Sequence, residues 1–211
     1  MKNDDAKKIM GENFIGYDEI ISISNDLNLE KIDIGSVPEI PFSEKVLNDN
    51  KDNILILGVS KHKDGSPLTL NSLRNLFGLD PEKKEPCFYN QDWYLKQGFA
   101  NESLESKWYL VKKNIEEKTR GEEPQKIISE LDNGESLPKA VVTAYVFFAN
   151  YLLNKEILWE GDFIWCSDLD DNGDRIYTGR YIDPSGKNKK GFNIHRHLSI
   201  RPCYGAILEI K

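Results

Sequence analysis

The stretch PKAVVTAYVFFANYLLN, residues 138–154, constrains the fold more strongly than any other part of the chain. Between residues 140 and 153 it is almost wholly apolar, interrupted by Thr143 and Asn150. A helix that is apolar nearly all round is buried rather than laid on a surface. Pro138 is a favourable first-turn residue, and Ser136 is a plausible N-cap. The stretch therefore predicts a buried central helix against which a sheet packs.

Short strands are expected after this helix, because apolar and aromatic runs there are separated by turns rich in Asp, Asn, Gly, Pro, Ser and Lys. The expected strands are 163–165, 175–182, 192–194 and 206–210. A buried helix followed by a β-meander predicts an α+β fold with a C-terminal antiparallel sheet.

The residues before the central helix predict further short elements. Apolar runs indicate strands at 54–59 and 108–111. Apolar spacing and capping residues indicate helices that start near Tyr17, after Ser43, near Thr69 or Asn71, and near Glu122. Residues 1–12 are polar and are expected to be disordered. The remainder, 13–211, is then one domain, in which 163–211 forms the region of most interest.

Bulk properties limit the classes of partner. The net charge of −7 argues against nucleic acid or an anionic membrane as the main partner, because both require a basic surface. No run approaches the ~18 apolar residues of a membrane span, and the N-terminus has no signal-peptide pattern. We therefore expect a soluble chain. The sequence encodes neither its compartment nor its oligomeric state.

An acidic segment resembles half of a calcium-binding loop. Residues 168–174, DLDDNGD, match D-x-[DN]-x-[DN]-G, but the twelfth position is Gly179 instead of a bidentate acid. The residues between predict a strand where an EF-hand has a helix. An acidic hairpin turn is the favoured interpretation, and a weak calcium site of another kind is the alternative.

Histidine and cysteine residues give no matched site. His195 and His197 would point to the same side of a strand, with Cys203 nearby, but no third metal ligand is evident. The three cysteines fit no zinc motif and are expected to be free thiols, although a Cys166–Cys203 bridge stays open. The chain has no nucleophile elbow, phosphate-binding glycine loop or dinucleotide fingerprint. We therefore predict no metal, no cofactor and no catalytic residue.

The window GFNIHRHLSIRPCYGAIL, residues 191–208, has an unusual composition. It contains no Asp, Glu, Lys, Gln, Trp or Met, although the chain as a whole is 30% charged. It carries two of the three histidines, and four of the six arginines lie at 175–201. Polar and apolar residues do not alternate cleanly from residue 195 to 204, as a half-buried strand would require. A segment rich in His, Arg and Tyr indicates an exposed recognition surface, with an irregular terminal loop as the alternative.

Several motifs along the chain resemble the variable proteins of diversity-generating retroelements, particularly archaeal and candidate-phyla members. The resemblance begins near Asn13 and covers nearly the whole chain. The motifs that carry it are NFIG (13–16), IPFS (40–43), DGSPLT (64–69), DWY (92–94), WYLV (108–111), YLLN (151–154), WCSD (165–168), DNGDRIYTGRY (171–181) and GFNI (191–194). The chain departs from the family pattern in its last residues, AILEIK, and in a long lysine-rich segment, 184–190. These departures leave the register of the variable positions open by a few residues.

The resemblance implies a C-type-lectin-like fold, shared with formylglycine-generating enzymes, whose variable residues lie on the terminal sheet and its loops. In this family a reverse transcriptase miscopies template adenines, so that AAY codons become NNY codons. Such codons cannot encode Lys, Glu, Gln, Met or Trp, all of which are missing from 191–208.

The implied function is non-catalytic binding of an unidentified protein or surface-exposed ligand by a diversified region within 163–211. Two alternatives are a calcium-dependent carbohydrate-binding lectin that uses residues 168–174 and an oxidoreductase of the formylglycine-generating type that uses Cys203 with Cys166. A third is a purely structural virion or surface component. The expected ligand contacts are Arg180, Asn193, His195, Arg196, His197, Ser199, Arg201, Cys203 and Tyr204.

Overall fold

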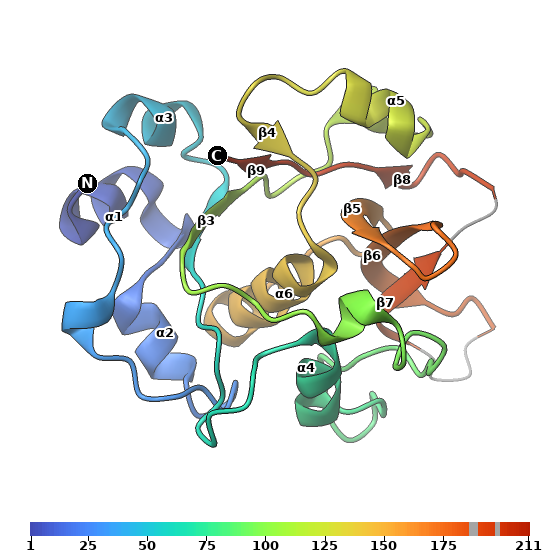
Figure 1. Ribbon diagram of the computed structural model, residues 1–211, viewed down its shortest axis with the longest axis horizontal. Helices are drawn as coiled ribbons and strands as arrows, with labels where there is room; N and C mark the ends of the chain where they lie inside the picture. The colour runs from blue at the N-terminus through green and yellow to red at the C-terminus, as the bar shows by residue number, and fades with distance from the viewer. Residues whose placement is uncertain (186–189, 197–198) are drawn as a thin grey trace.

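The computed structural model describes residues 1–185, 190–196 and 199–211. It is an α+β structure in which helix α6 (Ala140–Asn154) lies in the middle of the molecule, as Figure 1 shows. The N-terminal helices lie on one side of α6, and the four-stranded C-terminal sheet lies on the other. Within the described ranges, no helix is long and apolar enough to cross a membrane.

Helix α6 is buried, as its sequence predicts. Every residue from Ala140 to Asn150 is buried. The polar interruption at Thr143 is satisfied inside the core, because its hydroxyl lies 2.9 Å from that of Thr178. The cap differs from the prediction. Ser136 lies in strand β4 (Glu135–Ser136), and the carboxylate of Asp168 accepts a 2.6 Å hydrogen bond from the Ala140 N–H instead. A carboxylate at this end also interacts favourably with the helix dipole.

The first sheet has the strand order β1-β2-β3-β9-β4. Strands β2 (Ile54–Leu57) and β3 (Trp108–Val111) are fully buried and antiparallel, at the predicted positions. Strand β1 (Phe14–Ile15) pairs with β2 in parallel. The last strand, β9 (Glu209–Ile210), pairs with β3 and with β4, so the C-terminal end of the chain returns to the N-terminal sheet.

The remaining helices cover the edges of this core. The capping predictions are confirmed at Ser43, whose hydroxyl accepts from the Val46 N–H, and at Thr69, whose hydroxyl accepts from the Ser72 N–H. The α-helices are α1 (Asn3–Met10), α2 (Tyr17–Ile23), α3 (Glu44–Asp49), α4 (Leu70–Phe77) and α5 (Pro124–Ser129). The 3-10 turns are Gly11–Asn13, Ile34–Ser36, Gly98–Asn101 and Glu117–Thr119.

Helix α1 corrects the expectation that residues 1–12 are disordered. Ala6 and Met10 lie four residues apart, on one face of the helix, and both are buried. The N-terminal ammonium of Met1 also donates to the Ile40 carbonyl. Burial of a small apolar stripe, instead of local polarity, decides the structure of this segment.

The second sheet has the strand order β7-β6-β5-β8. Strands β5 (Phe163–Leu169), β6 (Arg175–Ile182) and β7 (Lys190–Arg196) form the predicted antiparallel meander. Strand β8 (Tyr204–Gly205) joins β5 in parallel. Residues 206–210 were expected to complete this sheet, but the pairing of β9 with β3 places their end in the first sheet.

One face of the second sheet packs on the central helix. The ring of Phe192 packs on that of Phe147 in α6 at a centroid distance of 5.0 Å. It also packs on the ring of Phe88, in the loop after α4, at 5.5 Å. Ile194 and Ile176 are buried in the same cluster. This inner face fixes the position of the sheet and leaves the opposite face for other contacts.

Candidate functional site

The outer face of the second sheet is rich in aromatic residues. Side chains alternate between the two faces of a strand, and the register places Tyr177 opposite His195 and opposite Trp165. Phe163 lies opposite Tyr204 on β8. A second hydrophobic cluster, separate from the main core, contains Phe163, Trp165, Tyr177 and Tyr204.

A hollow of about 380 Å³ opens on this face. We call it the aromatic hollow; its lining residues are Tyr89, Gln91, Phe163, Tyr177, Tyr181, Asn193, His195, Arg201 and Tyr204. Phe163, Tyr177, Asn193 and Tyr204 are buried, whereas Arg201 is exposed. Its volume and its mixture of rings with a few polar groups are typical of ligand-binding pockets.

The rings of the hollow hold one another in fixed orientations. Phe163 meets Tyr177 and Tyr204 edge-on, at centroid distances of 5.3 Å and 5.4 Å. Tyr177 and His195 are stacked 5.6 Å apart with an interplanar angle of 11°. Such pairs contribute roughly 0.5–1.5 kcal/mol each beyond their burial. The hollow is therefore a rigid surface.

Hydroxyl groups add polarity to this surface. The Tyr204 hydroxyl donates to the Tyr177 hydroxyl at 3.3 Å. Burial raises the pKa of Tyr177 well above its ordinary value, while the charge of Arg201 acts in the opposite direction. Tyr177 therefore stays neutral at physiological pH and presents a hydroxyl group instead of a phenolate.

One wall of the hollow comes from residues 87–93, about a hundred positions before β7. The Phe192 N–H donates to the Cys87 carbonyl at 2.8 Å, and the Tyr89 N–H donates to the Phe192 carbonyl at 2.9 Å. The indole N–H of Trp93 donates to the Ile194 carbonyl at 3.1 Å. These bonds cover the free edge of β7 and hold the wall against the sheet.

Gly191 permits this close approach. Its φ is +158°, and a Cβ atom there would lie 2.4 Å from the Tyr89 nitrogen. Two residues further along β7, the side chain of Asn193 lies on the outer face, and its oxygen accepts a hydrogen bond from the side-chain amide of Gln91. The wall is therefore bonded to the outer face as well as to the strand edge.

Four of the residues selected from the sequence line the hollow together: Asn193, His195, Arg201 and Tyr204. Ser199 is exposed, and Cys203 packs half-buried beside the outer-face cluster. His197 lies outside the described residues.

The structure corrects the expectation that Arg180 lies on the exposed face. Its side chain points to the inner side of the sheet, is 3% exposed and forms an ion pair with Glu85. Lys190 approaches the other carboxylate oxygen of Glu85 at 3.3 Å. A buried arginine is tolerated when it is paired, so Arg180 joins β6 to the segment before the wall.

Arg196 lies next to the hollow but takes part in a separate contact. Its guanidinium lies 5.0 Å above the ring of Trp93 and pairs with the carboxylate of Asp170. Asp170 also accepts backbone hydrogen bonds from Asn172 at 2.9 Å and from Asp174 at 2.8 Å. The acidic turn at 168–174 thus has its central carboxylate occupied by donors of this chain. Across the described residues, no group of three or more His, Cys, Asp or Glu could hold a metal ion.

The three cysteines are free thiols. Cys166 is fully buried on the inner side, 3.6 Å from the Thr178 hydroxyl, and burial raises its pKa far above the ordinary value. Cys203 packs on the outer cluster. The paired arrangement that the formylglycine-generating alternative requires is therefore not formed.

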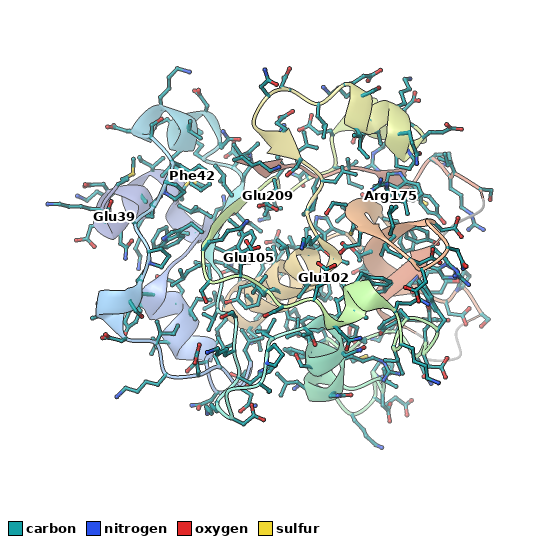
Figure 2. All side chains as sticks on the ribbon, viewed as in Figure 1. Glu39, Phe42, Glu102, Glu105, Arg175 and Glu209 are labelled. Carbon is teal, nitrogen blue, oxygen red and sulfur yellow. The ribbon has the colours of Figure 1, made fainter. Side chains whose placement is uncertain are left out.

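A second hollow, of about 220 Å³, lies between the two sheets and is lined by Glu105, Lys107 and Glu209 among others. Figure 2 shows Glu105 and Glu209 beside β3 and β9, away from Arg175 in the second sheet. Lys107 pairs with Glu105 at 3.0 Å and lies 3.6 Å from Glu209. Because both acidic residues of its described lining already approach Lys107, and Tyr109 is the one aromatic residue of that lining, this hollow is a weaker candidate than the aromatic one.

Sequence reasoning missed five of the nine described lining residues. The alternation of Tyr177 and Tyr181 on one strand could have indicated that they share a face. Tyr89 and Gln91 carry no such signal, because their contact with β7 depends on how the chain folds back.

No protein-family model matches this chain, and comparisons with curated proteins and with solved structures find no significant match.

Proposed function

We propose that this chain is a non-catalytic ligand-binding protein whose binding site is the aromatic hollow. We further propose that it is a variable protein of a diversity-generating retroelement, with a C-type-lectin-like fold and with diversification directed to the region 163–211. Its ligand would be a protein or another surface-exposed molecule.

One observation carries the proposal: four residues selected from the sequence alone, Tyr204 among them, converge in a single hollow with four further Phe and Tyr rings. Tyr, Arg, His and Asn side chains on a rigid frame are the groups that binding surfaces use, because they offer contact area and hydrogen bonds at low entropic cost.

The division of β7 into two faces supports diversification. The side chains of Phe192 and Ile194 pack in the core, whereas those of Asn193 and His195 line the hollow. Changes on the outer face would then alter binding while the core keeps the fold. The buried helix and the C-terminal antiparallel sheet that the sequence pattern predicts are both present, so the α+β framework on which the proposal builds is in place.

Two experiments test the proposal. The first is to sequence the 3′ end of the gene and its flanking DNA across a population. A near-identical downstream repeat beside a reverse-transcriptase gene, with differences at AAY codons, is expected. An invariant 3′ end without a repeat would reject diversification and leave a binding protein with a fixed ligand.

The second experiment compares two display libraries. One randomises Asn193, His195 and Arg201, and the matched control randomises Phe192, Ile194 and Ile207. We expect the first library to keep the fold and to yield binders against several protein targets, and the second to lose the fold. A library of outer-face variants that folds but binds nothing would reject the hollow as the binding site.

A further inference from the structure

The arginines of this chain differ in what their guanidinium groups contact. Five of them are engaged within the structure: Arg120 with Asp162, Arg180 with Glu85, Arg196 with Asp170, and Arg74 and Arg175 with backbone carbonyls. The sixth, Arg201, is exposed at the rim of the aromatic hollow. Because its side chain is exposed, its charge is available to a ligand.

The lining of the hollow is selective in charge. Among the described residues that line it, none is acidic, although the chain has a net charge of −7. Its polar groups other than Arg201 are amides, hydroxyls and the imidazole of His195. A cation entering the hollow would meet a like charge and no carboxylate, whereas an anion would meet a guanidinium.

The rings set the second requirement. Tyr89 and Tyr181 are half-buried and stand edge to face, 5.1 Å apart at an interplanar angle of 88°. They flank the hollow at the Tyr181 end of β6. Arg201 lies in the turn before β8, where its carbonyl accepts a 2.9 Å hydrogen bond from the N–H of Tyr204, and the Tyr204 ring lies 4.8 Å from that of Tyr177. The lining of the hollow therefore combines aromatic rings with one cation.

On the basis of the function proposed above, we infer that the aromatic hollow selects ligands that combine an aromatic ring with an anionic group. The ring packs among Tyr89, Tyr181 and Phe163, and the anion pairs with Arg201. Aromatic pairs prefer the edge-to-face and offset contacts that these rings offer. A guanidinium binds a carboxylate through two parallel N–H donors, which fixes the orientation of the ligand.

Small probes test this selectivity on the full chain by backbone amide chemical shifts at pH 7 and low salt. The probes are N-acetyl-L-tyrosine, which has a ring and a carboxylate, its neutral amide, and tyramine, which has a ring and a cation. We expect the acid to shift the amides of Tyr177, Asn193 and His195 and to bind about tenfold more tightly than the amide, as a charge-assisted contact allows. Tyramine should bind most weakly.

Two variants of the exposed arginine give matched controls. Arg201→Gln should abolish the difference between the acid and the amide while leaving binding of the ring. Arg201→Lys should keep most of the difference. A blocked Tyr-Asp dipeptide, compared with N-acetyl-L-tyrosine, distinguishes a peptide ligand from a free aromatic acid, and either result is compatible with the inference.

The outcomes separate this inference from the proposed function. If all three probes shift the hollow equally, or if Arg201→Gln leaves the preference unchanged, charge selection is overturned and the hollow remains a binding site. If the probes shift amides elsewhere, or shift none, both the inference and the assignment of the binding site are overturned.

Discussion

The guanidinium of Arg196, on β7, pairs with the carboxylate of Asp170 in the turn between β5 and β6. The Asp170 side chain is fully buried, and two backbone N–H groups donate to its other oxygen. This contact connects the strand that borders the hollow to the hairpin beside it. The sequence of this turn resembles a calcium-binding loop, but the cation that pairs with its central carboxylate is the guanidinium of Arg196.

Replacement of Asp170 by Asn should destabilise the protein in a pH-dependent manner. Burial acts to raise the pKa of Asp170, but hydrogen bonds from Arg196, Asp174 and Asn172 hold it below the ordinary value. A lowered pKa contributes stability that is present above the unfolded value and is lost as pH falls through the folded one. We expect Asp170→Asn to cost about 2 kcal/mol at pH 7.

Urea unfolding at several pH values measures this effect. The difference between the wild type and Asp170→Asn should shrink below about pH 4. Asp171→Asn, an exposed change in the same turn, is the control and should have little effect. A loss that is the same at pH 3 and pH 7 would contradict the role of the ion pair.

Calcium should not stabilise the protein. A ligand that binds the folded state raises its melting temperature, but the carboxylate of Asp170 is already bonded to Arg196 and to the turn backbone. We expect no shift in melting temperature at millimolar calcium, with magnesium as the control. A rise specific to calcium would support the lectin alternative.

Asp168 should show the opposite dependence on pH from Asp170. Burial raises its pKa from 3.8 to about 6, and the hydrogen bond from Ala140 acts in the other direction. A raised pKa contributes stability that is present below the unfolded value and is lost as pH rises through the folded one. Relative to Asp168→Asn, the wild type should therefore lose about 2–3 kcal/mol between roughly pH 4 and pH 6.5.

The Asn side chain can still accept the hydrogen bond from Ala140, so this variant isolates the charge of Asp168. Urea unfolding of both proteins at pH 4.5, 5.5 and 6.5 measures the difference. A gain in the stability of the wild type relative to the variant as pH rises would contradict the raised pKa of Asp168 and the burial that causes it.

The two faces of β7 should differ in their tolerance of substitution. Phe192 is packed among three phenylalanine rings, whereas His195 is half-buried in the hollow. Phe192→Ala should cost about 3–5 kcal/mol of unfolding free energy, and His195→Ala should cost about 1 kcal/mol or less. Denaturant unfolding compares the two variants directly, and equal losses would contradict the assignment of the faces.

The thiols should react at different rates in the native protein. Cys203 is half-buried, whereas Cys87 and Cys166 are buried, and burial raises the pKa of Cys87 to about 11. Since the thiolate is the reactive form, a thiol reagent should label Cys203 first and the other two only after unfolding. Cys203→Ser should remove the fast reaction. A disulfide-linked peptide that joins Cys166 to Cys203 would revive the oxidoreductase alternative.

Local patterns were sufficient where a segment carries its own signal. The apolar stretch 138–154 predicted α6, and the strands at 54–59, 108–111 and 175–182 were found where they were expected. Ser43 and Thr69 cap helices because an N-cap bond joins residues only three positions apart.

Contacts between distant segments were not readable in this way. Asp168 caps α6 in place of Ser136, β9 leaves the second sheet to pair with β3, and residues 87–93 form the wall of the hollow. Each of these contacts joins residues that lie far apart in the sequence, and no local spacing or periodicity relates them. Arg180 was misplaced because the sequence does not show which face of β6 is buried. Its partner on the inner face is Glu85, nearly a hundred residues earlier.

The sequence by itself determined that this protein has a buried central helix, a C-terminal meander and an unusual run of His, Arg and Tyr near its end, because periodicity and composition are local properties. Only the tertiary structure decided which of those residues share a surface. Strand register and the return of the chain set the face on which each side chain lies, and they brought Asn193, His195, Arg201 and Tyr204 together with rings from three other segments.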